Sequence, residues 1–123
     1  MGGAQRAGVA PIVALRHGVT QPGERLDAVF GALSDPTRRH MIERLVEDGP
    51  GTATDLARDL PISRQAVVKH LQALDAAGLV DAERVGREVR FAARSETLDD
   101  AVGWMSTVGA RWDRRLSRLR RRG

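Results

Sequence analysis

The stretch from Leu56 to Val80, LARDLPISRQAVVKHLQALDAAGLV, limits the possible folds of this chain more than any other. Two short helical patterns meet at the break Leu60-Pro61-Ile62-Ser63, and the period changes from 3.6 to two residues after Gly78. Ser63 is a good N-cap for the second helix, and Gly78 is a natural stop for it. This order predicts a helix-turn-helix followed by a hairpin.

The remaining periodicity predicts a mainly α fold with one small two-stranded β-hairpin. The expected helices cover about 25–33, 36–47, 52 or 54 to 60, 63–77 and 95–121. Their expected buried residues are Leu26, Val29, Phe30 and Leu33; Met41, Ile42, Leu45 and Val46; Leu56, Ala57 and Leu60; and Ala66, Val67, Leu71 and Leu74. The hairpin is expected at 79–93, with Val80 and Ala82 on one arm, Val89 and Phe91 on the other, and Val85-Gly86-Arg87 as the turn.

The length of 123 residues predicts one domain, at 23–123, preceded by an N-terminal extension at 1–22. Glycine and proline interrupt residues 1–22, so we expect a flexible segment, part of which could lie against the body through Ile12, Val13 and Leu15. The absence of cysteine excludes disulfides and thiolate metal sites. No apolar run is long enough to cross a membrane and no secretory signal is evident, so we expect a cytoplasmic protein.

The last predicted helix carries a long apolar stripe. Ser95 is its expected cap, and its apolar residues recur at alternating steps of four and three, which is a heptad seam. These residues are Leu98, Val102, Met105, Gly109, Trp112, Leu116 and Leu119. One short domain cannot easily cover such a stripe, so the pattern favours a second copy of the chain. Trp104 lies off the seam, where it can pack on the body of either subunit.

Charge is distributed unevenly along the chain. Residues 111–123 hold seven Arg and one Asp, a net charge of +6, whereas the whole chain is only +4. The Arg-rich end has two interpretations that the sequence leaves open. It is either a solvated helix end that complements the helix dipole, or a source of nonspecific attraction to phosphates.

The outer side of the helix at 63–77 offers side chains that suit a DNA major groove. Arg64 and Lys69 can donate to guanine, Gln65 can pair with adenine, and Val68 can contact a thymine methyl group. Ser63 and Thr54 are placed to bind phosphate, and Arg84 and Arg87 of the hairpin could enter a minor groove. Each group alone could be ordinary surface, but their order favours double-stranded DNA as the partner.

Residues 26–94 resemble the winged helix-turn-helix of the ArsR-type transcriptional regulators. The matching stretches are LSDPTRRHMIERL (33–45), TDLARDLPISRQAVVKHLQALDAAGLV (54–80) and VGREVRF (85–91). The resemblance implies a homodimeric repressor that binds a palindromic operator and dimerises through its first and last helices, with Leu26 and Phe30 in the first. It also implies that Ser63, Arg64, Gln65, Val68 and Lys69 face DNA, although Val68 departs from a commonly polar position.

The sequence predicts neither a metal site nor a cofactor. The start of the third helix has Thr52-Ala53-Thr54 where metal-responsive relatives of this kind carry cysteines, and no histidine follows His70. The chain therefore resembles the metal-free branch of the family, and the sequence names no small-molecule effector. Two other classes of function fit the sequence less well. An enzyme lacks support because no catalytic triad or phosphate loop is present, and a protein-binding winged helix would leave Arg64, Gln65 and Lys69 without a purpose.

Overall fold

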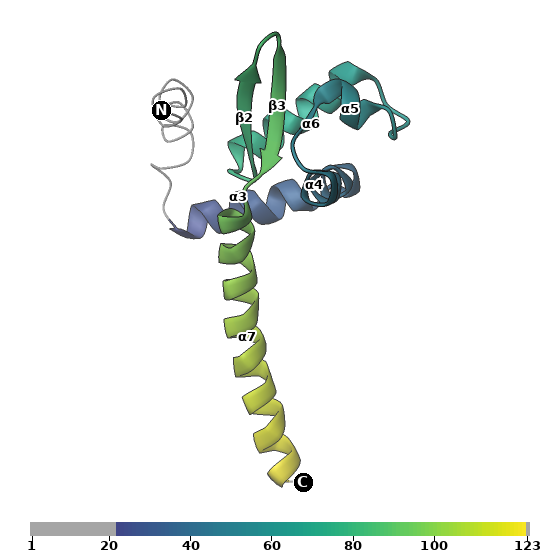
Figure 1. Cartoon of the computed structure of the whole chain (residues 1–123). Coiled ribbons are helices and arrows are strands. Elements are labelled where there is room, and N and C mark those ends of the chain that lie inside the picture. Colours follow the sequence, from purple (N-terminus) through teal and green to yellow (C-terminus); the bar gives the residue numbers. More distant parts are fainter. Residues whose placement is uncertain (1–21, 123) are drawn as a thin grey trace.

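The computed structural model describes residues 22–122. The expectation of a flexible extension with contacts from Ile12, Val13 and Leu15 falls on residues outside this range. The helices are α3 (Pro22–Leu33), α4 (Pro36–Asp48), α5 (Ala53–Ala57), α6 (Arg64–Ala76) and α7 (Ser95–Arg122). The strands are β1 (Gly51–Thr52), β2 (Val80–Val85) and β3 (Glu88–Ala93). Figure 1 shows α3 to α6 and the β2–β3 hairpin gathered in one body, from which α7 projects.

The predicted hairpin is confirmed, and the structure adds a third strand that the sequence did not reveal. β2 and β3 pair antiparallel, with Ala82 opposite Phe91. Gly86 makes the turn with a φ of 63°, a conformation that glycine adopts without strain. β1 pairs antiparallel with the other edge of β3, so the strand order is β1-β3-β2. Two residues are too few to show an alternating pattern, which is why β1 escaped prediction.

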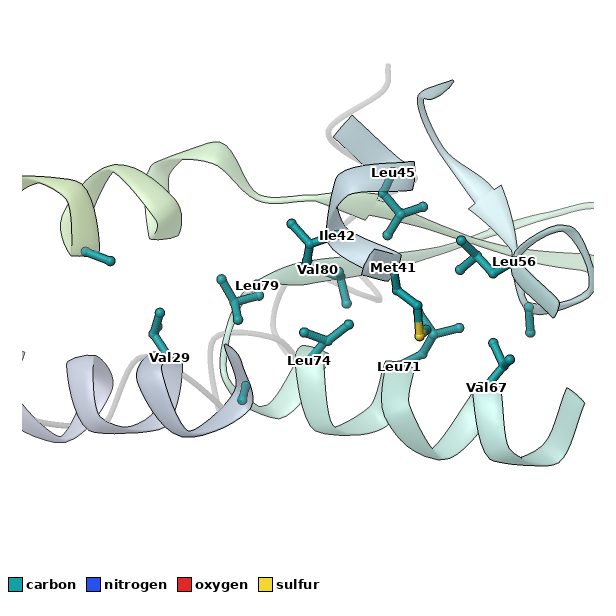
Figure 2. Close-up of a cluster of buried hydrophobic side chains, with 13 residues drawn as sticks. Val29, Met41, Ile42, Leu45, Leu56, Val67, Leu71, Leu74, Leu79 and Val80 are labelled. Atoms are coloured by element: carbon teal, nitrogen blue, oxygen red, sulfur yellow. The ribbon is translucent and has the colours of Figure 1, made fainter. Parts of the chain in front are cut away.

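The core lies where α4, α5 and α6 meet the base of the hairpin (Figure 2). Fully buried side chains from α4, α6 and the start of β2 form its centre: Met41, Val67, Leu71, Leu74, Leu79 and Val80. Val29 of α3 and Ala101 of α7 also belong to this cluster. The inner face predicted for α6 therefore packs as expected, and Ala66 lies half-buried at its margin.

One predicted core residue is wrong. Val46 of α4 is 61% exposed, whereas Met41, Ile42 and Leu45 on the same helix are buried. At 100° per residue, Val46 lies about 90° from the centre of the stripe formed by those three side chains. It therefore faces solvent, beyond the reach of α6 and the sheet.

Side-chain caps explain where the helices begin. Asp35 accepts hydrogen bonds from the amides of Thr37 and Arg38 at 2.8 and 3.2 Å, and Pro36 follows as the first residue of α4. Ser63 accepts from the amide of Ala66 at 3.1 Å, which confirms it as the N-cap of α6.

A reciprocal pair caps α5. The amide of Asp55 donates to the Thr52 hydroxyl, and the amide of Thr52 donates to the Asp55 carboxylate, both at 3.0 Å. This second bond is the largest reason why the pKa of Asp55 lies below its usual value of 3.8, with the Thr52 hydroxyl and the charges of Arg58 and Arg90 adding to it. In Asp35, the amide of Arg38 is the main cause of a lowered pKa.

The predicted cap of the last helix is wrong by one residue. The amide of Leu98 bonds to the carbonyl oxygen of Arg94, so Arg94 holds the cap position and Ser95 is the first helical residue. The chain enters α7 almost directly from β3, and Arg94 fastens this junction by ion pairs to Asp81 at 3.6 Å and Glu96 at 2.9 Å. Two other boundaries moved by three residues each: α3 begins at Pro22 instead of Arg25, and α5 ends at Ala57 instead of Leu60.

Only the first part of α7 contacts the body. Ala101 is buried against it, and the Trp104 ring meets Phe30 of α3 edge to face, with 5.6 Å between the ring centroids. The prediction that Trp104 packs on the body is therefore confirmed within one chain. The 28 residues of α7 span about 42 Å, and most of that length extends away from the other helices (Figure 1).

The contrast between Met41 and Val46 gives a direct test of the core. Met41→Ala should lower the free energy of unfolding by about 2–5 kcal/mol, because it leaves a cavity among fully buried side chains. Val46→Ala, on the same helix, should change it by less than about 0.5 kcal/mol. Urea unfolding followed by circular dichroism measures both, and equal losses for the two variants would contradict this assignment of the core.

The caps predict how stability depends on pH. Asp55 has a lower pKa folded than unfolded, so its contribution is present above the unfolded value and is lost as the pH falls through the folded value. The free energy of unfolding should therefore decrease from about pH 5 towards pH 2. Asp55→Asn should flatten this dependence, with Asp35 accounting for part of the remainder. Urea titrations at several pH values would refute the role of the cap if the variant and the parent lost stability in parallel.

Candidate nucleic-acid interface

The outer side of α6 is a polar surface that the fold leaves open. Burial of Val67, Leu71 and Leu74 turns this side away from the body. Gln65, Lys69 and Gln72 are exposed along it. Ser63 and Arg64, the cap and the first residue of α6, are exposed at its start, where Arg64 bonds to Thr54 of α5. The predicted members Ser63, Arg64, Gln65 and Lys69 are therefore all accessible to solvent. Val68 differs from them, because it is half-buried and packs against the core.

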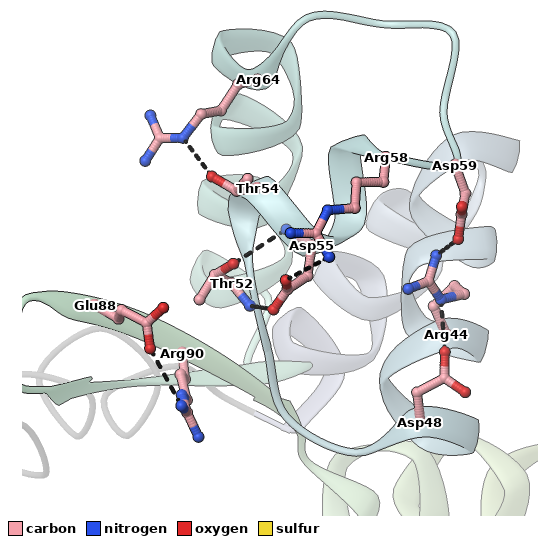
Figure 3. A network of polar contacts seen from close by, with 10 residues as sticks. All are labelled: Arg44, Asp48, Thr52, Thr54, Asp55, Arg58, Asp59, Arg64, Glu88 and Arg90. Carbon is pink, nitrogen blue, oxygen red and sulfur yellow. Dashed lines mark hydrogen bonds and ion pairs between the residues drawn. The ribbon is translucent and has the colours of Figure 1, made fainter.

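Arg64 and Thr54 link the two helices of the motif. The Arg64 Nε donates to the Thr54 Oγ1 at 3.2 Å, and both residues are exposed (Figure 3). This bond uses one of the five N–H groups of the guanidinium and leaves the four on the terminal nitrogens to reach outward. Because Thr54 accepts here, its own hydroxyl proton remains available to donate. The two residues that the sequence assigned to base and phosphate therefore form one unit.

A polar network holds α5 in place beside α6. Arg44 of α4 bonds through Nε to Asp48 at 2.8 Å and through Nη1 to Asp59, which lies just before the turn into α6 (Figure 3). The Arg44 side chain is only 23% exposed, so its charge is partly shielded from solvent. Arg44 therefore ties α4 to the segment that connects α5 to α6. Sequence reasoning overlooked this residue, since no local pattern joins positions 44 and 59.

The capping pair of α5 was also overlooked, although it had a signal. Thr52 and Asp55 match the pattern of a Ser or Thr followed three residues later by an acid, which marks a helix start. Asp55 also forms an ion pair with Arg58, at 3.6 Å between Oδ1 and Nη1. These bonds set the direction of the helix that carries Thr54.

The hairpin carries a second group of exposed cations. Arg84 on β2 and Arg87 in the turn are both exposed. Arg90 lies on β3, and its Nη2 meets the Glu88 Oε1 at 3.2 Å, so its charge is partly satisfied within the hairpin (Figure 3). The hairpin therefore offers Arg84 and Arg87 as its least engaged cations.

The residues predicted for a dimer interface divide into two groups. Leu26, Phe30 and Leu98 are half-buried in the body, and Leu116 is half-buried further along α7. The others project from α7 into solvent, with exposed fractions of 54% for Val102, 49% for Met105, 59% for Trp112 and 54% for Leu119, and Gly109 is exposed between them. An apolar stripe this open has no covering surface within residues 22–122.

Residues 22–122 hold no group of three or more His, Asp or Glu side chains that could bind a metal ion. Over the same range, no helix has both the length and the apolar character required to cross a lipid bilayer.

Comparison with known proteins agrees with this geometry. Residues 33–83 match a family model described as a helix-turn-helix domain. The transcriptional repressor SdpR of Bacillus subtilis is 34% identical over 80 residues, a stretch that makes up 65% of this chain and 88% of that protein. An uncharacterised helix-turn-helix regulator of the same organism, YuzN, is 38% identical over 86 residues, with 64% of this chain and 94% of that protein covered.

A solved structure supports the same assignment over most of the chain. An ArsR-like transcriptional regulator from Rhodococcus sp. RHA1 superposes with a TM-score of 0.70 and 43% identity, and covers 80% of this chain and 92% of that one. The relatives and the fold are those of transcriptional regulators and not of enzymes. The chain therefore belongs to the ArsR family of helix-turn-helix, DNA-binding transcriptional regulators.

Proposed function

We propose that this protein is a homodimeric repressor that recognises a palindromic operator through α6, with the β2–β3 hairpin as its wing. The observation that carries the proposal is the exposed polar side of α6, opposite a fully buried apolar side. A helix held in this way can enter a major groove without disturbing the core behind it. The relative SdpR, whose name describes a transcriptional repressor, supports the direction of regulation.

Within the groove, Arg64 and Gln65 are the proposed readers of base edges. They occupy the first turn of α6, the end of a recognition helix that reaches the bases in helix-turn-helix complexes. The bond from Arg64 to Thr54 lowers the freedom that the guanidinium loses on binding, which favours a defined contact. Lys69, one turn further, adds a third contact.

Phosphate contacts would set the register of the complex. Ser63 and Thr54 are exposed residues on either side of the break between α5 and α6, where their hydroxyl groups can donate to phosphate oxygens of the DNA backbone. Val68 remains a proposed apolar contact, restricted by its partial burial. Arg84 and Arg87 of the wing would lie along the adjacent minor groove.

A second copy of the chain is the proposed cover for the apolar stripe of α7. Pairing would remove Val102, Met105, Trp112 and Leu119 from water, each worth roughly 1–3 kcal/mol if fully buried. In this interface, Leu26 and Phe30 of α3 would lie at the edges of the paired α7 helices.

Such a dimer places two copies of α6 about a twofold axis, which is why the operator should be palindromic. A regulator of this kind acts on the chromosome, so we place it in the cytoplasm.

Substitution on α6 tests the recognition assignment. Arg64→Ala and Gln65→Ala should each weaken binding to the operator upstream of the gene by about 1–3 kcal/mol, because each removes a contact to a base edge. Arg25→Ala, which removes an exposed cation from α3, is the matched control and should bind like the parent. Fluorescence anisotropy at one fixed salt concentration measures all three. If both α6 variants bound the operator with the affinity of the parent, the assignment of α6 to the major groove would be wrong.

Substitution on α7 tests the dimer. Trp112→Asp buries a charge in the proposed seam and should convert the protein to monomers at micromolar concentration. Thr107→Asp adds the same charge to the exposed side of α7 away from the seam and should leave the dimer intact. Sedimentation velocity distinguishes the two states. A dimeric Trp112→Asp protein would show that α7 does not form the interface.

A further inference from the structure

Four arginines near the end of α7 form a continuous line that the proposed dimer does not use. Arg111, Arg114, Arg118 and Arg121 follow one another at steps of three, four and three residues, and all four are exposed. At 100° per residue, their mean direction lies about 170° from that of the seam. We refer to these four residues as the outer arginine band.

The band is not neutralised by the residues described around it. Among residues 22–122, none of its members forms an ion pair. The one acid nearby, Asp113, has Gly109, Ala110, Leu116 and Ser117 at the helical positions where an arginine could pair with it. The charge of the band is therefore open to an external anion.

Helix stability does not account for the band. Like charges three or four residues apart destabilise a helix, and the band contains such pairs along its whole length. A favourable effect of the helix dipole reaches only the last turn, so it can involve Arg121 but not Arg111 or Arg114. The band thus destabilises the isolated helix. A bound anion would relieve this repulsion between its arginines.

The position of the band separates it from the recognition surface. In Figure 1, α7 leads away from α6 and the hairpin, and its far end lies opposite them. In one chain, the band therefore cannot reach the segment of duplex whose major groove holds α6. From Arg111 to Arg121 the band is about 15 Å long, which matches about four phosphates along one strand of DNA.

We propose that the outer arginine band is a second, sequence-independent surface for the phosphates of duplex DNA. A protein that holds its operator through α6 could then hold another DNA segment through α7, a consequence that rests on the proposed function. The positive charge of each side chain supplies most of such sequence-independent attraction, and a guanidinium can also donate to two oxygens of one phosphate. A membrane fits less well, because a helix on a lipid surface inserts its apolar side and would point this band towards water.

The test uses full-length protein in which all four band residues are changed together. One variant carries Arg111→Gln, Arg114→Gln, Arg118→Gln and Arg121→Gln, and its matched control carries lysine at the same four positions. Glutamine and lysine resemble arginine in helix propensity, so both variants should fold and dimerise. Operator DNA is fixed to beads and loaded with protein, and the beads are then offered a labelled duplex without the operator.

The glutamine variant should bind the operator within about threefold of the parent but capture at least tenfold less of the second duplex. The lysine variant should capture it nearly as well as the parent. On the non-operator duplex alone, the glutamine variant should lose about two to four units from the slope of log affinity against log salt. The protein with Arg64→Ala and Gln65→Ala should lose operator preference yet keep the parental slope, so a failure of the α6 assignment is distinguishable from a failure of the band.

Several results would overturn the proposal. One is a parent protein that captures no second duplex, and another is a glutamine variant that captures it as well as the parent. Binding of the parent to vesicles of anionic phospholipid, lost in the glutamine variant while DNA capture persists, would reassign the band to a lipid surface. A glutamine variant that sediments as a monomer would assign the band to the subunit interface.

Discussion

Burial of one side of α6 is the constraint on which the rest of the structure depends. Val67, Leu71 and Leu74 lie fully out of solvent in a cluster with Met41 of α4, and α5 and the base of the hairpin close around them. Apolar side chains at this spacing can be buried only if the helix keeps one orientation, and its polar residues then face solvent. The candidate interface thus lies on the side of α6 opposite the core, and the packing of the buried side fixes its position.

Polar contacts at the ends of elements convert this orientation into a defined surface. Asp35, Thr52 with Asp55, and Ser63 cap three successive helices, and Arg44 joins α4 to the turn before α6. Each contact contributes little free energy on the protein surface, but together they fix the helix ends. A flexible turn at these points would let the angle of α6 vary. The bond from Arg64 to Thr54 lies at the end of this chain of contacts and belongs to both scaffold and site.

α7 is a helix with two chemically different sides and little attachment to its own body. Ala101 and Trp104 bind its first turns to α3 and the core, after which apolar and cationic stripes continue along opposite sides. A single chain covers neither stripe within the described residues. We propose that a second subunit covers the apolar side and that duplex DNA contacts the cationic side.

Local patterns in the sequence were enough to predict the helix-turn-helix, the hairpin, the cap at Ser63 and the apolar stripe of α7, because spacing and capping act between residues a few positions apart. Tertiary structure alone decided which residues contact each other. It added β1 to the sheet and left Val46 in solvent. It also joined Arg64 to Thr54 and Arg44 to Asp59, and it placed the far end of α7 away from α6. These features arise between segments distant in sequence. Their contacts depend on how the elements pack around a shared core, which no local period records.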